Sequence, residues 1–291
     1  MSEPSPIRNV SDTALWMAIY RAMESERPDA IFHDSHARRL GGERGQSIVD
    51  SMPRGAATVW PMVVRTAVMD EIVMRCVRAG VRTVLNLAAG LDARPWRLDL
   101  PPSLRWLHVD LPEMNEYFRS RMDGEAPRCD VQFIAADLRE AGARSEAFAQ
   151  AAMRGTILVI TEGLLVYLTP EQVADLARDL HDIVHAKWWL TDLASPMLRK
   201  LMERLHWLNK LQQSNAPMQF FPEQGTAFFE PCGWREAEFH SIWDESFRLG
   251  RVMRGAQFFR LLSKLQPKHK QQTGRRMSGI VLLESVVAPG N

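Results

Sequence analysis

Five short apolar runs alternate with helix-like segments through the middle of this chain of 291 residues. Such an alternation predicts parallel strands, because each connection between them must return over one face of the sheet and usually does so as a helix. The expected strands are residues 81–87, 104–110, 131–137, 156–163 and 186–194. Two more apolar runs, at 247–254 and 279–288, bring the expected number of strands to seven. We therefore predict an α/β fold with a doubly wound, mostly parallel sheet.

The segments outside the five runs suggest how the chain is divided. Helical spacing of apolar residues predicts helices at 12–27, at 59–79 and, in an amphipathic form, at 197–211. The last of these lies in a long interruption of the strand pattern, which would hang over the edge of the sheet. The four expected parts are an N-terminal helical lid at 1–80, an α/β core at 81–194, a helical and loop insertion at 195–240, and the last two strands at 241–291.

Composition limits the kind of protein that this chain forms. Apolar residues make up 46% of it and the formal net charge is +1, which allows a large core and gives no reason to expect a nucleic-acid partner. Residues 1–12 lack the apolar segment of an export signal, and no apolar run is long enough to cross a bilayer. We expect a cytoplasmic protein without a membrane partner. The sequence allows a homo-oligomer but does not indicate one.

Metal and polyanion sites are not expected. The three cysteines lie far apart without C-x-x-C spacing, and the eight histidines form no pair with metal-ligand spacing. A basic stretch at 264–276 precedes the last strand. We interpret it as a solvated connection, with a polyanion site as the alternative, because clusters of like charge are usually just exposed.

A loop of small residues follows the first strand. Ala88, Ala89 and Gly90 let the backbone pass close to a ligand and leave amide N–H groups free, which is typical of a nucleotide-binding loop. Gly90 is the position where a side chain would most obstruct a ligand. The loop lacks the G-x-G-x-x-G glycines of a dinucleotide-binding fold, so an ordinary tight turn is the alternative.

Three successive strands end in an acidic residue: Asp110, Asp137 and Glu162. Because the carboxyl ends of parallel strands share one edge, the three acids should lie together. They suit a ligand rich in hydrogen-bond donors, and S-adenosylmethionine has ribose hydroxyls, an adenine amino group and an ammonium group. We expect Asp110 to bind the ribose, Asp137 the adenine and Glu162 the ammonium group. Asp110 and Asp137 could instead cap the helices that follow them.

Several motifs together resemble the leucine carboxyl methyltransferase family. They run in order from Ser11 to Tyr167 and comprise SDTALWMAIYRAMESERPDAIFHD, RTAVMD, LAAGLDARPWRL, VDLPEM, IAADL and TEGLLVYLTPEQV. The family includes bacterial S-adenosylmethionine-dependent O-methyltransferases, among them polyketide carboxyl methyltransferases of the tetracenomycin type. Beyond residue 195 only a Gly-Trp pair at Gly233 and Trp234 and a final apolar strand match. The resemblance implies a Rossmann-like methyltransferase with S-adenosylmethionine as cofactor and a small molecule as methyl acceptor.

The resemblance also implies roles for residues around the cofactor. Arg65, in RTAVMD, matches the family's arginine that contacts the cofactor carboxylate, although without the family it would be interpreted as a surface arginine. Leu111 and Leu138 follow the ribose and adenine acids and are expected at the same site. Glycine usually stands where this chain has Ala88, which could weaken cofactor binding.

Two more features of the matched region concern the lid and the loop. Asp92 and Arg94 match the family's loop and are interpreted as an ion-paired brace. Arg21, in the lid helix, is expected over the same site. His33 and His36 flank a turn where the family usually has Asp-Pro-Tyr, so the local structure of the lid is expected to differ.

The chemistry of the acceptor decides which side chains it needs. A carboxylate is ionised near neutral pH and needs no general base, but a cation must bind it. A phenol needs a base. The candidate cations are Arg199, Lys200, Arg204 and Arg254, the candidate bases are His33, His36 and His240, and Tyr167 is expected either to line the acceptor pocket or to lie in the core.

Two other functions are compatible with the same sheet. One is a nicotinamide-dependent oxidoreductase, although the missing glycines and the three acids disfavour a bound diphosphate. The other is a non-catalytic relative that keeps the fold as a binding or dimerisation module. The substitution at Ala88 and the altered lid turn are the features that keep this second alternative open.

Overall fold

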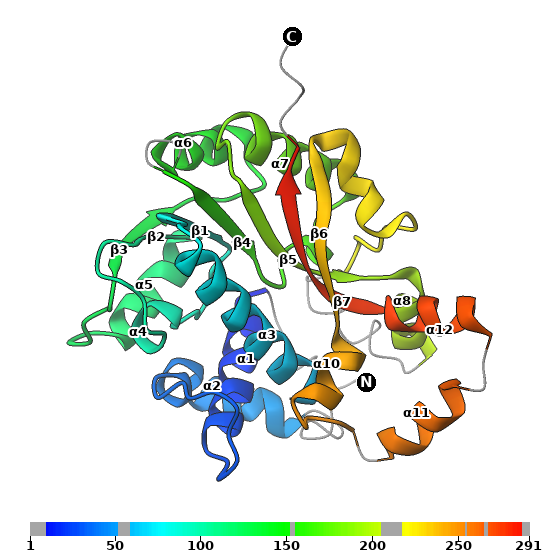
Figure 1. Ribbon diagram of the computed structural model, residues 1–291. Helices are drawn as coiled ribbons and strands as arrows, with labels where there is room; N and C mark the ends of the chain where they lie inside the picture. Colours follow the sequence, from blue (N-terminus) through cyan, green and yellow to red (C-terminus); the bar gives the residue numbers. More distant parts are fainter. Residues whose placement is uncertain are drawn as a thin grey trace, which may run out of the picture.

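The protein is described here from a computed structural model, which covers residues 10–51, 59–151, 155–204, 217–253, 255–264 and 267–286. A seven-stranded sheet in the order β3-β2-β1-β4-β5-β7-β6 forms its centre (Figure 1). The pairs among β1 to β5 are parallel, whereas β7 is antiparallel to both β5 and β6. The strands are β1 Thr83–Leu87, β2 Arg105–Asp110, β3 Asp130–Ala135, β4 Ile157–Thr161, β5 Trp188–Ala194, β6 Trp234–Ser241 and β7 Ser278–Ser285. The prediction of a doubly wound, mostly parallel sheet is confirmed.

Helices cover both faces of the sheet, so neighbouring residues of a strand enter different cores. On one face, Val84 and Leu158 pack with α3, Val59–Arg78. On the other face, Leu85 and Val159 pack with α6, Ala141–Ala151, and α7, Pro170–Asp182. Because both faces are covered, all five residues of β1 and of β4 are buried. This explains why the central strands are continuous apolar runs in the sequence.

The remaining helices follow the alternation along the chain. Thr169 caps α7 through a reciprocal capping box with Gln172, as the Thr-Pro-Glu start at this point suggests. Further helices and 3-10 turns of the described residues have the following bounds: α4 Arg94–Arg97, α5 Pro112–Arg121, α6 Ala141–Ala151, η2 Leu165–Tyr167, α7 Pro170–Asp182, α8 Pro196–Arg204, η3 Gly225–Cys232, α10 Ile242–Arg248, α11 Ala256–Lys264 and α12 Lys268–Arg275.

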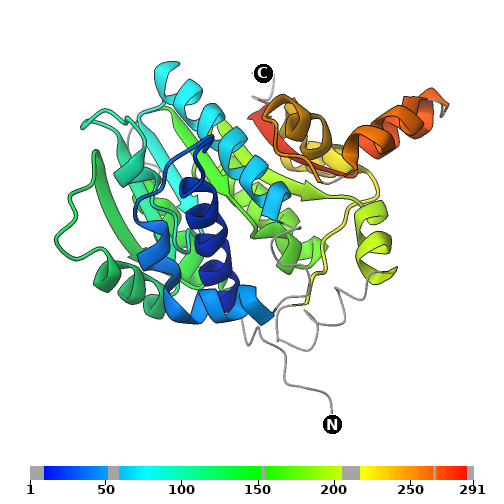
Figure 2. The ribbon, with the colours of Figure 1, turned by 90° about the horizontal axis from the view of Figure 1, so that it is seen from below.

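The N-terminal helices pack against each other beside the carboxyl ends of the strands (Figure 2). The expected helix at 12–27 is α1, Val10–Ser25, and it is joined by α2, Ala37–Ser51, which the sequence analysis did not predict. A side chain on Gly45 would lie 2.8 Å from the carbonyl oxygen of Leu15, so this glycine lets the two helices approach closely. Ala14 of α1 lies over Gly90, where an added Cβ would be 3.3 Å from its Cβ.

Two expectations for the C-terminal third are wrong in detail. The penultimate strand is β6, not residues 247–254. The expected stretch instead begins with the last turn of α10, a helix that Ser241 caps by accepting a hydrogen bond from the amide of Asp244. β6 lies at the edge of the sheet and is rich in exposed charged residues, which hides it from a search for apolar runs. The expected helix at 197–211 is present as α8 to Arg204, and its remainder lies outside the described residues.

Candidate functional site

A cavity of about 1300 Å³ lies at the carboxyl ends of the parallel strands. All eight residues that the sequence analysis assigned to cofactor binding line it: Arg65, Ala88, Gly90, Asp110, Leu111, Asp137, Leu138 and Glu162. They come from α3 and from the segments that follow β1, β2, β3 and β4. The topology of the sheet thus brings together side chains that are spread over nearly 100 residues of sequence.

The loop after β1 turns through two residues with left-handed backbone conformation. Gly90 has a φ of 53°, which glycine adopts without strain, and Ala88 has a φ of 49°, which an L-residue adopts only at a cost. The amide of Gly90 donates a hydrogen bond of 2.6 Å to Oδ2 of Asp110, and the amide of Ala89 donates one to the carbonyl of Val109. The second strand therefore fixes the shape of the loop.

Asp110 stands between the loop and α5. Its Oδ1 accepts the amide of Leu111 at 2.7 Å, so each carboxylate oxygen already holds one backbone N–H group. Burial raises the pKa of Asp110, and these two hydrogen bonds oppose the rise. The alternative of a helix cap is wrong, because the N-cap of α5 is Leu111 and no side chain caps it. Each oxygen keeps a lone pair for a further donor.

Asp137 lies two residues beyond β3 and closes a turn there. Its Oδ1 accepts the amide of Arg139 at 3.0 Å, and the guanidinium of Arg139 pairs with Oδ2 at 2.6 Å. The hydrogen bond from this side chain lowers the pKa of Asp137. The arginine is largely exposed, so Asp137 keeps an ionised carboxylate at the mouth of the cavity with a partner that water also surrounds.

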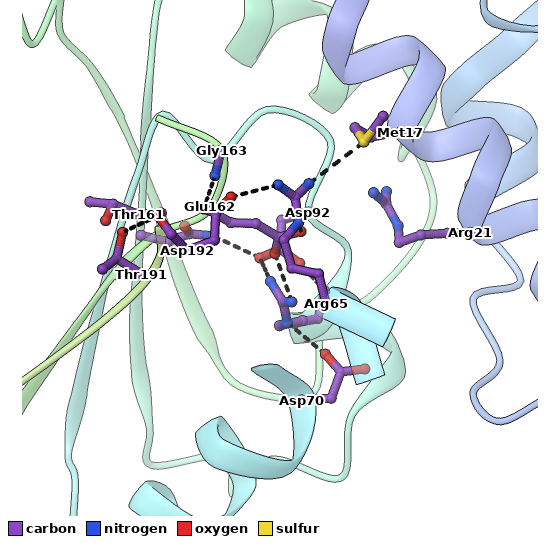
Figure 3. Close-up of polar contacts among 12 residues, drawn as sticks. Met17, Arg21, Arg65, Asp70, Asp92, Thr161, Glu162, Gly163, Thr191 and Asp192 are labelled. Carbon is purple, nitrogen blue, oxygen red and sulfur yellow. Dashed lines mark hydrogen bonds and ion pairs between the residues drawn. The ribbon is translucent and has the colours of Figure 1, made fainter. Parts of the chain in front are cut away.

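Glu162 and Arg65, which both line the cavity, meet in an ion pair (Figure 3). Nε of Arg65 lies 3.1 Å from Oε1 of Glu162, and Nη1 lies 3.0 Å from Oδ2 of Asp192 on β5. The amide of Gly163 donates to Oδ1 of Asp192 at 2.6 Å. Arg65 is only 9% exposed, so the alternative of a surface arginine is wrong.

The pKa of Glu162 reports this environment. Burial by itself would raise it, but the charges of Arg94 and Arg65, with the hydrogen bond from Arg94, outweigh burial and lower the pKa to about 2. Glu162 is therefore a carboxylate at neutral pH although its side chain is mostly buried.

Arg94 is the centre of the ion pairs below the cavity. The expected brace is present, with Nη1 of Arg94 at 2.7 Å from Oδ2 of Asp92. Arg94 also pairs with Asp70 of α3 at 2.7 Å and with Glu162 at 2.8 Å. Its side chain is 2% exposed. The brace thus connects the loop, α3 and the end of β4.

The same ion pairs continue into the lid. Arg97 pairs with Asp70 at 2.6 Å and lies 3.8 Å from Asp34, which precedes α2. Arg21 of α1 pairs with Asp34 at 2.9 Å and donates to the carbonyl of Leu91 at 2.6 Å. Arg21 lines the cavity, as expected. The charged groups joined in this way are Arg21, Arg65, Arg94 and Arg97 with Asp34, Asp70, Asp92, Glu162 and Asp192.

The sequence analysis missed Asp192 and Asp70. Asp192 lies near the carboxyl end of the fifth apolar run, as the other acids do, but inside the run WWLTDLA and not after it. Its position near the carboxyl end of a predicted strand, at the sheet edge where the other acids lie, could have indicated that Asp192 belongs to the site. Asp70 lies within the matched motif RTAVMD, five residues after Arg65 on the same helix. No neighbouring residue in the sequence indicates that it meets Arg94 and Arg97.

The candidate acceptor residues lie in different places. Tyr167 lines the cavity and is partly buried, and this loss of contact with water raises its pKa. Arg199 of α8 pairs with Glu203 at 2.9 Å outside the cavity wall, and Arg254 lies outside the described residues. His240 on β6 lies between Glu238 and Glu245, at 2.9 and 3.2 Å. Within the described ranges, His33, His36 and His240 do not line the cavity.

Much of the remaining cavity wall is apolar. Tryptophan, methionine and phenylalanine side chains from α1, α3, α8 and the segment before η3 form it: Trp16, Trp60, Met62, Met202, Met218 and Phe220. Methionine is flexible and adapts to irregular shapes. Where the chain is described, no group of three or more His, Cys, Asp and Glu side chains could hold a metal ion.

Replacing Ala88 by glycine is expected to raise the free energy of unfolding by up to about 1 kcal/mol. The left-handed conformation costs an L-residue about 1–2 kcal/mol, and the freedom of glycine in the unfolded chain offsets part of the gain. Chemical denaturation measures the change. The matched control is Ala89→Gly, because φ of Ala89 is not positive and the substitution should destabilise. An equal decrease in the free energy of unfolding in both variants would contradict the prediction.

Comparison with known families gives one match of substantial length. A family model described as leucine carboxyl methyltransferase matches residues 14–181. A relative from Saccharopolyspora erythraea, named as a candidate S-adenosyl-L-methionine-dependent methyltransferase, is 32% identical over 185 residues, or 61% of this chain and 64% of the relative. One from Frankia alni with the same kind of name is 34% identical over 86% of this chain and 90% of its own. The match to the first relative thus spans less than two thirds of its length.

Two solved structures share the fold. A DUF574 family protein from Streptomyces avermitilis superposes with a TM-score of 0.57 at 12% identity, over 92% of this chain and 96% of that chain. A candidate methyltransferase from Thermobifida fusca gives a TM-score of 0.57 at 14% identity, over 93% and 94%. At these identities the likeness concerns the fold, which agrees with the sheet described above.

Proposed function

This chain belongs to the leucine carboxyl methyltransferase family, and on that premise we propose that it transfers a methyl group from S-adenosylmethionine to a carboxylate of a large, mainly apolar small molecule. One observation carries the proposal. Asp110, Asp137 and Glu162, which their strand-end positions assigned to three groups of this cofactor, and Arg65, which the family resemblance assigned to a fourth, line one cavity. No part of the chemistry requires a metal ion or a second cofactor.

The adenosine end of the cofactor would lie at the loop after β1. Asp110 keeps one lone pair on each oxygen for the two ribose hydroxyls, and its carboxylate already holds the loop in place through Gly90. Leu111 and Leu138 would pack beside the ribose and the adenine. Asp137 would accept the adenine amino group at the end of β3.

The methionine end would lie at Arg65, Glu162 and Asp192. Arg65 presents a planar guanidinium that fits a carboxylate, and the two acids suit an ammonium group. These protein groups pair with one another in the structure. A ligand with both an ammonium and a carboxylate group can separate Arg65 from the two acids, because its carboxylate then pairs with Arg65 and its ammonium group with the acids, and no buried charge is left unpaired.

The sum of charges favours the same ligand. The connected ion pairs contain four arginines and five carboxylates, so one negative charge is in excess. S-adenosylmethionine carries one net positive charge, from an ammonium, a sulfonium and a carboxylate. A dinucleotide would instead bring a diphosphate to this acidic edge. The charge balance therefore supports the sulfonium cofactor over NAD.

When bound, S-adenosylmethionine supplies a methyl group that its sulfonium activates for displacement by the acceptor oxygen. The contribution of the chain is to hold the donor through the acids and Arg65, and the acceptor in the apolar part of the cavity, with the two aligned. α1 covers the loop at Gly90 and helps to exclude water. Tyr167, partly buried in the wall near Arg65, is the polar side chain that we assign to positioning of the acceptor.

A carboxylate acceptor fits the lining better than a phenol. An ionised carboxylate needs no general base, and in the described part of the wall no histidine is available to act as one. With such an acceptor the rate at saturating concentrations should stay within about twofold between about pH 6 and pH 9, because the acid is ionised throughout. A phenol without a base would give a rate that rises about tenfold per pH unit in this range. A steep rise would overturn the carboxylate assignment.

Calorimetric titration tests the proposal directly. The purified chain is titrated with S-adenosylmethionine and S-adenosylhomocysteine, and with NAD as the control. Micromolar binding of the two sulfur compounds and none of NAD is the expected result. Binding of NAD alone would favour an oxidoreductase, and the absence of binding by all three would favour a relative that keeps the fold without the activity.

A further inference from the structure

The C-terminal segment from residue 246 to residue 283 has a charge distribution unlike the rest of the chain. It contains nine Lys and Arg residues and no Asp or Glu, whereas the whole chain is nearly balanced, with 36 basic and 35 acidic residues. Four of the nine pair with acids from other segments: Arg248, Arg251, Arg275 and Arg276. Lys268 and Lys270 of α12 are exposed and pair with no acid among the described residues.

The same segment exposes large apolar side chains. Phe258 and Leu261 of α11 are each 62% exposed, and Phe259 is 52% exposed. α11 lies apart from the sheet in Figure 1 and is joined to α10 through Arg260, which lies over the ring of Phe247, while α12 also contacts α10. Three such side chains on one short helix are not the scattered single residues of an ordinary surface. We call α11 and α12 together the basic aromatic arm.

The basic aromatic arm adjoins the cavity. Gly274 of α12 and residues that flank the arm in the sequence line the cavity wall, and so do residues of α8 that are themselves partly exposed. On the arm side these are Met253, Gly274, Met277 and Ser278, and on the α8 side Leu198 and Leu201. The chain on either side of the arm's exposed side chains thus reaches the cavity wall.

We propose that the basic aromatic arm docks on the surface of an anionic lipid bilayer. Phe258, Phe259 and Leu261 would enter the boundary between headgroups and acyl chains, and Lys268 and Lys270 would contact the anionic headgroups. This departs from the expectation of no membrane partner, which rested on the absence of a spanning segment. In the described parts of the chain, indeed, no helix combines the length and apolar character needed to cross a bilayer. Docking on a surface does not require one.

Charge distinguishes a bilayer from a second copy of this chain. A symmetric dimer through the arm would bring two segments without acids against each other, and their charges would repel. A bilayer offers acyl chains and negative charge together, which matches what the arm exposes. If the proposed methyl transfer is correct, an amphiphilic acceptor could pass from the bilayer along the arm into the cavity. The docking itself does not depend on that activity.

Flotation of the full chain with lipid vesicles tests the docking. Vesicles of phosphatidylcholine with about one third phosphatidylglycerol are compared with pure phosphatidylcholine, at low and high salt. We expect binding to the anionic vesicles that weakens at high salt. Phe258→Ser with Phe259→Ser, and separately Lys268→Glu with Lys270→Glu, should each lower the partition coefficient about tenfold or more.

Matched variants outside the arm serve as controls. Val286→Ser changes another exposed apolar residue, which is 42% exposed, and Arg78→Glu with Lys187→Glu reverses two exposed charges. Neither control should change binding by more than about twofold. Circular dichroism and S-adenosylmethionine titration of each variant show whether the fold and the cofactor site persist, so failure of docking and failure of the proposed function are separate results.

Three results would overturn the proposal. One is no binding to anionic vesicles, as expected if the arm meets an acidic protein. Another is binding that the arm variants and the controls change equally. The third is a dimer in solution that the Phe258→Ser and Phe259→Ser changes convert to a monomer, because the apolar residues would then cover each other and not a lipid surface.

Discussion

Replacing Arg94 by methionine is expected to lower the free energy of unfolding by about 3–5 kcal/mol at neutral pH. Arg94 is buried and pairs with Asp70, Asp92 and Glu162, and methionine keeps much of its volume without its charge. Removing one partner of buried ion pairs leaves carboxylates without compensation, and that accounts for a loss of this size. Urea denaturation of the wild type and the variant measures the difference.

The effect of pH on this difference has a definite sign. The pKa of Glu162 is lowered from 4.5 to about 2 in the folded protein. Its pairing therefore stabilises the fold fully above about pH 4.5, and this stabilisation is lost as the pH falls toward 2. In the variant the unpaired carboxylates take up protons more readily when folded, which favours the folded state at lower pH. The difference between wild type and variant should thus be largest at neutral pH and shrink as the solution is acidified.

The control for Arg94 is an exposed ion pair. Arg178 and Asp175 lie 3.1 Å apart on the surface of α7, with about half of each side chain exposed. Arg178→Met should cost no more than about 0.5 kcal/mol, because solvent screens such pairs. If Arg94→Met cost as little as Arg178→Met, the buried ion pairs would not stabilise the site as described.

Asp110→Ala is expected to weaken binding of S-adenosylmethionine about 30- to 700-fold without unfolding the chain. This corresponds to about 2–4 kcal/mol, the worth of charge-assisted hydrogen bonds together with the groups left unpaired. Two effects act together. The ribose hydroxyls lose their acceptor, and the amide of Gly90 loses the carboxylate that fixes the loop. Calorimetric titration measures the affinity, and denaturation shows that the fold persists.

Another acid of the same cavity serves as the control for Asp110. Glu113, in the first turn of α5, also lines the cavity, and Glu113→Ala removes the same charge without removing a hydrogen bond to the loop. The affinity of the Glu113→Ala variant for S-adenosylmethionine should differ from that of the wild type by less than about threefold. Unchanged affinity in a folded Asp110→Ala protein would show that the ribose is not bound there.

The fold was largely predictable because its central strands carry a strong local signal. β1 and β4 are buried on both faces, so their sequences are continuous apolar runs that propensity and spacing identify. β6 escaped detection for the opposite reason. It lies at an edge and exposes Arg235 and Glu236, and a strand with one covered face and charged residues resembles a loop in the sequence.

The gathering of the three acids in one cavity was predictable because the topology of a parallel sheet is itself a rule. Once strands alternate with helices, the residues that follow them must meet at one edge, and this places Asp110, Asp137 and Glu162 in one cavity. The acceptor side had no such rule. Arg199 and His240 are of suitable types, but their elements direct them to Glu203 and to Glu238 and Glu245, away from the cavity wall.

The sequence by itself determined the five parallel strands, the loop at Gly90 and the edge at which the acids gather, because these follow from burial and chain direction over short stretches. Only the tertiary structure decided which charges pair. Arg94 meets Asp70 of α3 and Glu162 beyond β4, 24 and 68 residues away, and Asp192 joins Arg65 across 127 residues. Coulomb attraction depends on distance in space and on exclusion of water, and neither can be read from positions along the chain.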